Sequence, residues 1–392
     1  MTVETRGSSR ESPGSATSLR VANLQRVLAV LLDARGAAVT QAELTRTTGL
    51  AAGTVSSIVR ELAAAAVVDT VAGSGRRGTT VRLARGAGLV AGVDFGHSHV
   101  MVAVGDMAGQ ILAEARRPID PGHDHDEGLD RAGEMLDGLL EGLDAQHHEL
   151  RNIGLGLPAP ISDEVVMSSA ILPGWVGVNA RRAAARRFGR AVQIDNDANL
   201  GALAEHRHGA GRGHADMVFV KVSSGVGAGL IIDNTLYRGS TGTSGEIGHL
   251  TLDDQGPLCR CGSRGCLEAY AASGTALSMM SEQMPDATID DLVRSAHEGN
   301  VAALRVFEDA GLHLGWGLAA LTNLMNPGII VVGGDMARAG DLLLDSARIG
   351  LRRHVLAGAA TTPVVAAALG DRASVIGAML LAIEATDLVP DG

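Results

Sequence analysis

All three cysteines of the chain, Cys259, Cys261 and Cys266, fall within eight residues. Their spacing is C-x-C-x4-C, and His249 precedes the first of them by ten residues. Three thiolates and an imidazole form a closed set of four ligands, the kind that holds structural zinc. The alternative is three buried thiols without a metal, but their clustering favours an ion. The sequence therefore predicts a zinc site made of His249, Cys259, Cys261 and Cys266.

The composition limits what can surround this site. Among 392 residues there are 52 glycines and only 2% aromatic residues, so the cores must be built from aliphatic side chains. This mixture favours α/β layers joined by tight turns over a β-sandwich. No apolar run is long enough to span a bilayer, and the first 18 residues lack the apolar core of a signal peptide. We therefore expect a cytoplasmic protein, in which thiols stay reduced.

The net charge of −11 is unevenly distributed. Residues 1–86 hold 11 arginines and 6 acidic residues, a net charge of +5. The remainder holds 22 basic and 38 acidic residues, a net charge of −16. A basic head joined to an acidic body indicates that only the head contacts nucleic acid.

The basic head divides into a polar tail and a small helical domain. Residues 1–18 are rich in Ser, Gly, Arg and Glu and predict a disordered tail. Apolar residues at helical spacing predict a first helix from Leu19 to near Gly36. Thr40 and Glu43 predict a capping box at the start of a second, shorter helix.

After a turn at Gly49, a third helix is expected over residues 52–66. Two short helices joined by a tight turn are typical of a helix-turn-helix, and strands expected over 67–71 and 79–83 make it a winged one, spanning residues 19–86. The expected DNA contacts, on the third helix and the wing, are Thr54, Ser56, Ser57, Arg60, Arg76 and Arg77. The alternative is a trihelical dimerisation module, but the paired arginines favour DNA.

Beyond a glycine-rich joint at residues 86–88, four motifs follow predicted strands. Asp94 to Ser98 forms a turn that can hold Mg²⁺ through water, and residues 223–229 form a glycine-rich loop that can approach phosphate. Residues 195–199 place carboxylates at a strand-to-helix junction, and residues 333–334 end an apolar strand. Each motif alone is weak, because hairpin turns and helix caps use the same residues.

Two further segments carry open predictions. Residues 126–150 have the pattern of an amphipathic helix. Trp175 follows Pro173 and Gly174 in a predicted loop, where its ring could stack on a sugar or pack in the interior. The sequence does not separate these two roles.

Taken together, the GVGAGL and GEIGH segments and the CRCGSRGCLE loop resemble the ROK family, over roughly residues 19–390. Members of that family are sugar kinases or sugar-responsive repressors. The resemblance implies an α/β, actin-like (ribonuclease H-like) two-lobed ATPase fold, preceded in the repressor branch by a winged helix-turn-helix. Residues 87–390 would form the sugar-binding or kinase-like domain, with one lobe of about 87–200 plus the C-terminal helix and another of about 201–372.

The resemblance also implies roles for single residues. Asp197 would be the catalytic base of a kinase, and His249 would contact the sugar through the nitrogen that does not bind zinc. The implied sugar-binding residues are Asn196, Asp197, Glu246, His249 and Glu268. The implied contacts to the phosphates and adenosine of ATP are Asp94, Gly96, Ser98, Gly225, Gly227, Gly229, Gly333 and Gly334.

The chain departs from the kinase pattern at two places. Kinases of this type usually show Asp-x-Gly-Gly-Thr, whereas His97 and Ser98 replace the second glycine and the threonine. A side chain at position 97 obstructs the close approach of a triphosphate, which puts the use of ATP and Mg²⁺ in doubt. Ala170 and Ile171 stand where kinases tend to carry an asparagine that contacts the sugar, so the choice of sugar is expected to differ.

These observations predict a sugar-responsive transcriptional regulator, in particular a repressor of carbohydrate genes. We expect it to bind double-stranded operator DNA and a sugar or sugar phosphate, to form a homodimer or homotetramer, and to use no membrane. The alternative is an active ATP-dependent hexose kinase that also carries a DNA-binding domain, because Asp197 and both phosphate loops are present.

Overall fold

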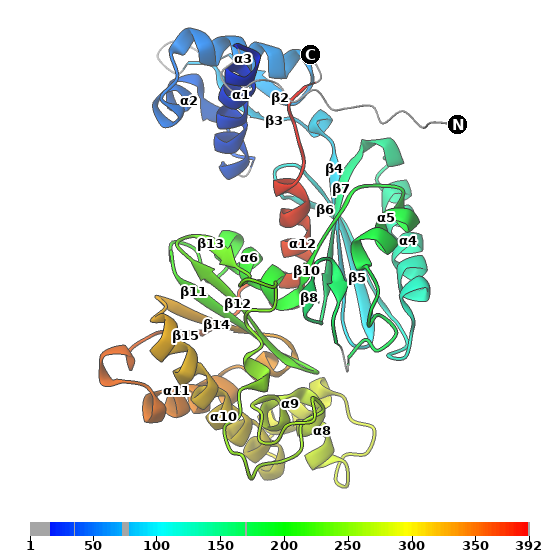
Figure 1. Ribbon diagram of the computed structural model, residues 1–392, viewed down its shortest axis with the longest axis vertical. Helices are drawn as coiled ribbons and strands as arrows, with labels where there is room; N and C mark the ends of the chain where they lie inside the picture. Colours follow the sequence, from blue (N-terminus) through cyan, green and yellow to red (C-terminus); the bar gives the residue numbers. More distant parts are fainter. Residues whose placement is uncertain (1–15, 35, 73–77, 169–170, 391–392) are drawn as a thin grey trace. The chain divides into compact units, whose positions relative to one another are not determined.

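The computed structural model describes residues 16–34, 36–72, 78–168 and 171–390, and it divides into two compact units (Figure 1). Within the described residues, the first unit comprises the chain up to Leu89 together with residues 105–112 and 386–390. The second comprises Val90–Val104 and Ala113–Ala385. The predictions made for Arg76, Arg77, Ala170 and residues 1–15 of the tail lie outside the described residues.

The first unit contains three helices and a small antiparallel sheet with the strand order β1-β3-β2. Its elements are α1 (Ala16–Asp33), β1 (Val39–Thr40), α2 (Gln41–Thr48), α3 (Ala52–Ala64), β2 (Val68–Val71) and β3 (Thr80–Leu83). The first helix begins at Ala16, so the last three residues of the predicted tail are helical. This order of helices and strands is that of a winged helix-turn-helix.

Local sequence signals fix the ends of these helices. The capping box predicted at α2 is confirmed, because the Thr40 hydroxyl accepts a hydrogen bond from the Glu43 amide and the Glu43 carboxylate accepts one from the Thr40 amide. Gly49 ends α2 with a φ of 69°, a left-handed conformation that suits glycine. The third helix ends at Ala64, two residues earlier than predicted, because Ala66 has a φ of 57°.

The core of the first unit is aliphatic, as the composition requires. Each helix presents one apolar face to the small sheet, while the opposite face of α3 stays exposed. The buried side chains include Leu24, Val27, Leu28, Leu31, Leu44, Val55, Ile58, Val59, Leu62 and Val81. This packing holds α2 and α3 together as a helix-turn-helix.

The second unit contains two five-stranded sheets. The first has the order β10-β7-β4-β5-β6, in which β10 runs parallel to β7. Its strands are β4 (Leu89–Phe95), β5 (His99–Asp106), β6 (Ile111–Pro118), β7 (Leu150–Leu157) and β10 (Val192–Asn196), and a short hairpin adds β8 (Ile161–Ser162) and β9 (Val165–Val166). Figure 1 shows α12 (Ala373–Glu384) on one face of this sheet and α4 (His125–Gly142) and α5 (Ala180–Phe188) on the other.

The helix predicted over residues 126–150 is shorter than expected. It ends at Gly142, because Asp144 adopts a φ of 53° and a short turn of 3₁₀ helix, His147–Glu149, precedes the next strand. The chain therefore reaches β7 as a strand from Leu150 onward.

The second sheet has the order β13-β12-β11-β14-β15. Its strands are β11 (Met217–Val222), β12 (Val226–Ile232), β13 (Thr235–Tyr237), β14 (Ile329–Gly333) and β15 (Val364–Ala366), with β11 antiparallel to β12 and parallel to β14. The helices near it are α6 (Asp197–His208), α7 (Glu268–Ala271), α8 (Ser273–Met280), α9 (Ile289–His297), α10 (Val301–Met325) and α11 (Asp341–His354). Because side chains alternate along β11, Val218 and Val220 join the core formed with α10 and α11, whereas Met217 and Phe219 pack toward Ala202 of α6.

Close packing between α6 and α12 sets the position of the residues at their N-termini. A Cβ atom added to Gly377 of α12 would lie 1.9 Å from the backbone oxygen of Leu200 in α6, so only glycine allows this approach. The two helices consequently bring Asp197 and Ser374, the first or second residue of each, to the same place.

In the part of the chain that the structure describes, the longest apolar helices still fall short of what crossing a bilayer requires.

Candidate functional site

A cavity of about 1020 Å³ lies in the second unit, between the ends of β10, β11 and β12 and the cysteine-rich loop. Its lining combines carboxylates, two cations and small residues, and it brings together several residues that the sequence singles out. Those are Asn196, Asp197, Gly225, Gly227, Glu246, His249, Cys261 and Glu268. A concave site of this size with convergent polar groups suits a small polar ligand.

The junction between β10 and α6 places Asn196 and Asp197 at the cavity wall. The Asn196 side-chain oxygen caps α6 by accepting hydrogen bonds from the amides of Ala198 and Asn199, and its amide nitrogen donates to the Ala159 backbone oxygen. One N–H of Asn196 is therefore left for a ligand. The neighbouring carboxylate is structural: Asp195 is buried and pairs with Arg238 at 2.7 Å.

Asp197 forms an ion pair with Lys221 of β11. The Lys221 Nζ atom lies 2.7 Å from Asp197 Oδ2 and donates a second hydrogen bond, of 3.1 Å, to the Ser374 hydroxyl. Ser374 in turn donates to the Asp197 backbone oxygen. Although burial alone would lower it, the Asp197 and Asp94 carboxylates raise the pKa of Lys221 above its usual range, so the amine is an ammonium ion.

Asp94 lies at the end of β4 beside this pair. Its side chain is only 3% exposed, and its Oδ1 atom has no hydrogen-bond partner. Burial raises the pKa of Asp94 to about 6, against the attraction of Lys221. In the turn that follows, the His99 ring packs over Gly96, where an added Cβ would lie 2.3 Å from it.

The two glutamates of the cavity have different surroundings. The Glu268 carboxylate is buried, accepts a hydrogen bond from the Val226 amide and lies 2.8 Å from the Arg260 guanidinium. Glu246 instead faces other carboxylates. Burial, followed by the charges of Asp197 and Glu268, raises the pKa of Glu246 to about 7. A carboxyl group that titrates near neutral pH can both donate to and accept from a sugar hydroxyl.

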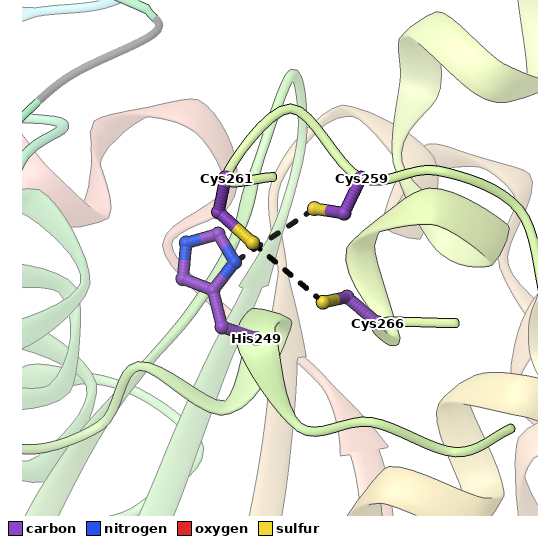
Figure 2. A group of neighbouring side chains, drawn as sticks. All are labelled: His249, Cys259, Cys261 and Cys266. Carbon is purple, nitrogen blue, oxygen red and sulfur yellow. Dashed lines mark hydrogen bonds between the residues drawn. The ribbon is translucent and has the colours of Figure 1, made fainter. Parts of the chain in front are cut away.

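His249, Cys259, Cys261 and Cys266 form a group whose ligand atoms all lie within 4.8 Å of one another (Figure 2). His249 Nδ1 lies 3.9 Å from Cys259 Sγ, and Cys261 Sγ lies 3.8 Å from Cys266 Sγ. Ligands about 2.0–2.3 Å from a tetrahedral zinc ion are separated by about 3.5–3.8 Å, so these spacings fit such an ion. The group could therefore hold a metal ion, with Nδ1 of His249 as ligand and its other nitrogen free.

The glycine-rich segment is shorter as a loop than predicted. We expected a loop over residues 223–229, but β12 already begins at Val226. Gly229 packs against α6, where an added Cβ would lie 2.5 Å from the Ala198 backbone oxygen. Gly229 therefore serves helix packing, whereas Gly225 and Gly227 line the cavity.

The remaining predicted nucleotide contacts lie outside the main cavity. Ser98 is exposed, and its neighbour His97 lines a second cavity of about 650 Å³, which shares Ser224 with the first. At the end of β14, Gly334 has a φ of 89°, and the next residue, Asp335, donates its amide to the Ser223 hydroxyl at 3.0 Å. Gly333 packs against the Phe219 ring.

Trp175 packs in the interior and is not part of the cavity lining. It is fully buried, and its ring centroid lies 5.0 Å from that of Phe95. Its indole nitrogen donates to Nε2 of His123. Of the two roles left open by the sequence, stacking on a sugar and packing in the interior, the structure supports packing.

The candidate DNA-contacting residues that the structure describes lie together on α3. Ser57 and Arg60 are exposed, and Thr54 and Ser56 are half-buried, on the side opposite Val55, Ile58 and Val59. This face carries no apolar side chain that would need burial, which suits a helix that enters a groove of DNA.

Sequence reasoning missed Lys221 and Arg260 of the cavity lining, and also Arg238 and Ser374, which bind Asp195 and Asp197 beside it. A usable signal existed for the first of them, because Lys221 is the single lysine of the chain and interrupts the apolar strand MVFVKV. Arg260 lies within the cysteine motif and pairs with Glu268 at its end. Arg238 and Ser374 bind residues 43 and 177 positions away, and no local pattern marks them.

Comparisons with known proteins agree with this geometry. Residues 90–385 match the ROK family. The xylose repressor of Caldicellulosiruptor bescii is 28% identical, over 94% of this chain and 97% of the relative. The crystal structure of a ROK family glucokinase from Streptomyces griseus, in complex with glucose and AMPPNP, is 31% identical with a TM-score of 0.68, over 76% of this chain and 100% of the other.

A third similarity spans both units. The crystal structure of a ROK family transcriptional regulator, a homologue of the E. coli MLC protein, has a TM-score of 0.78 at 22% identity, over 93% of this chain and 96% of the other. It confirms the predicted fold, an α/β two-lobed actin-like unit preceded by a winged helix-turn-helix. Since the family match alone covers most of the second unit, the chain belongs to the ROK family.

Proposed function

We propose that this protein is a sugar-responsive transcriptional repressor of carbohydrate genes. The observation that carries the proposal is a winged helix-turn-helix in the same chain as a ROK sugar cavity, with similarity to a xylose repressor across 94% of the chain. Operator DNA would bind through α3 and the wing, and a sugar in the cavity would change operator affinity. Because helix-turn-helix proteins bind paired half-sites, we further propose a homodimer or a homotetramer as the active form.

For the domain boundaries we keep residues 19–86 as the DNA-binding domain and 87–390 as the sugar domain. Within the latter, we propose that Asn196, Asp197, Glu246, His249 and Glu268 bind the sugar. Their support is that all five line one cavity and offer acceptors and donors for hydroxyl groups. We propose zinc as the ion of the cysteine-rich loop, since three thiolates and one imidazole select it over harder ions.

Operator binding tests the function directly. Fluorescence anisotropy of the DNA upstream of its own gene would be measured at fixed salt, with and without xylose, glucose and their phosphates. We expect specific binding that one of these ligands reverses. Arg60→Ala should weaken operator binding by about 1–3 kcal/mol, whereas Arg26→Ala removes the same charge from α1 and should leave it nearly unchanged. If the protein binds no operator specifically under any ligand condition, the proposed repressor function is wrong.

A sugar kinase is the second candidate, because Asp197 lines the cavity and a glucokinase is 31% identical. The ROK family includes kinases, so this candidate needs its own test. ADP release would be followed across hexoses with Mg-ATP, with Asp197→Asn as the control. Turnover that this substitution abolishes would establish the kinase; no turnover above that control would remove it.

A further inference from the structure

The chain contains one lysine, and all its other basic side chains apart from histidine are arginines. That lysine, Lys221, sits in a mostly buried position, where its side chain is 19% exposed and that of its partner Asp197 is 11% exposed. It joins three elements, because it extends from β11 to Asp197 of α6 and Ser374 of α12. Because the chain uses arginine elsewhere, its single lysine indicates that this position requires the geometry of an ammonium ion.

The two cations differ in shape. An ammonium is a compact point charge with three donors, whereas a guanidinium is a planar fork that needs more room. Between one carboxylate and one hydroxyl from neighbouring helices, the compact ion donates to both acceptors from a single nitrogen. In this respect Lys221 resembles a small metal cation more than a typical ion-pair partner.

The groups around Lys221 are those that a divalent cation would take. Asp197 and Ser374 give it oxygen atoms, and its charge also acts on Asp94 and Asp335. Carboxylate and hydroxyl oxygens are the ligands that hard divalent ions prefer. Asp94 is an independent indication of a cation site. Buried carboxylate oxygens normally have a hydrogen-bond partner or a bound cation, whereas Oδ1 of the buried Asp94 has no hydrogen-bond partner.

We propose that Lys221 is a resident cation that takes the place of a divalent metal in the carboxylate cluster of Asp94 and Asp197, so that the cavity binds its sugar without a metal-bound nucleotide. A fixed positive charge repels a second cation at the same place, and its ion pair with Asp197 occupies one of the carboxylates that a metal would need. The proposal rests on the proposed function only in taking a sugar as the ligand. It makes Lys221 the residue that separates a sugar receptor from a phosphoryl-transfer site.

The single lysine makes a direct experiment possible. Protein grown with ¹³Cε-lysine has one labelled side chain, and Mn²⁺ broadens any resonance near its binding site. We expect that Mn²⁺ titrated into the zinc-loaded wild type gives no saturable broadening of this resonance. In the same titration, followed by the electron paramagnetic resonance of free Mn²⁺, Lys221→Met and Lys221→Gln should each gain one saturable site, with affinity at least about tenfold above the wild type.

Two controls tie the new site to the cluster. Adding Asp94→Asn to Lys221→Gln should abolish it, and Arg131→Gln, which removes an exposed charge from α4, should create none. Saturable broadening in the wild type overturns the proposal, as does a folded Lys221 variant that gains no site. If neither variant folds, the wild-type titration decides alone. Operator binding is measured separately, so its failure would refute the repressor while the Mn²⁺ result stands.

Discussion

At the scale of single residues, the cavity holds its charges in fixed pairs. Asp197 is paired with Lys221 and Glu268 with Arg260, so neither carboxylate depends on a ligand for a partner. Glu246 is the exception, because its nearest charged neighbours, Asp197 and Glu268, repel it. A neutral, hydroxyl-rich ligand fits such a site better than an anion, since both cations are already engaged.

Glu246 should make stability depend on pH. Its pKa rises from 4.5 to about 7 on folding, so the unfolded chain loses this proton first and the folded state is penalised as pH rises from 4.5 through 7. The Glu246→Gln variant does not lose stability in this way, because glutamine does not ionise. Its stability relative to the wild type should therefore increase by about 1–2 kcal/mol between roughly pH 5.5 and roughly pH 8.5. Urea unfolding of both zinc-loaded proteins at the two pH values measures this; an unchanged difference would contradict the assigned burial.

The cavity residues that belong to sequence motifs could be predicted. Their ion-pair and hydrogen-bond partners could not. Short sequence motifs mark three of the predicted residues, Asp197, Glu246 and His249. Lys221 meets Ser374, which lies 153 positions away, and only the fold brings the two together. The apolar surroundings of Lys221 in β11 were the one local sign that its charge needed a buried partner.

At the scale of elements, the cysteine-rich loop and His249 together form a group that could hold a metal ion, and His249 also lines the cavity. Cys261→Ser should lose the ion, lower the melting temperature by at least about 4 °C and reduce the stabilisation that a bound sugar gives. Ser263→Ala, in the same loop but outside the ligand set, should keep about one zinc ion per chain. Zinc content and thermal unfolding with and without sugar measure these effects. A metal-free protein that responds normally to sugar would refute the link.

The contact between α6 and α12 gives a second test at this scale. Gly377→Ala places a Cβ atom 1.9 Å from the Leu200 backbone oxygen, so the helices must separate, at a cost of about 2–4 kcal/mol. Gly138→Ala, on the exposed face of α4 with open space around it, should instead stabilise the protein by about 0.5–1 kcal/mol. Denaturant unfolding distinguishes the two. Equal stability of the variants would mean that α6 and α12 pack less closely than described.

Most elements could be predicted from periodicity and caps, but several of their ends could not. Residue patterns located α2 through its capping box, yet they extended the helix at 126–150 past Gly142 and began β12 four residues too late. The first error comes from the left-handed turn at Asp144 and the second from glycines that serve packing against α6. Both depend on tertiary contacts, which periodicity does not record.

At the scale of the whole molecule, the division into a DNA-binding unit and a sugar unit followed from charge and motif order. What the sequence did not indicate is that the first unit also includes residues 105–112 and 386–390. These segments join α12 and the first sheet of the sugar unit to the DNA-binding unit through continuous chain. The helix that carries Ser374 at its start thus leads directly into the other unit.

Removal of the last segment should separate sugar binding from its effect on DNA. A chain that ends at Ala385 keeps the cavity but loses Leu388, which is 6% exposed. We expect an unchanged thermal shift with sugar and weaker, less sugar-dependent operator binding. A chain that ends at Val389 keeps Leu388 and should behave as the full protein. If the shorter chain binds and releases its operator normally, the segment has no part in the response.

The first unit is built from segments that are translated at different times, and this affects the order in which it folds. The three helices and the wing leave the ribosome early, but the segment from Thr386 is translated only after the entire sugar unit. Domains generally fold as they emerge, so the early helices wait for a piece of their own unit that arrives last. A first unit with all its segments is consequently present only on chains whose sugar unit has already been translated. Interrupted translation products would be poor competitors for the operator, and every competent repressor would carry its own sensor.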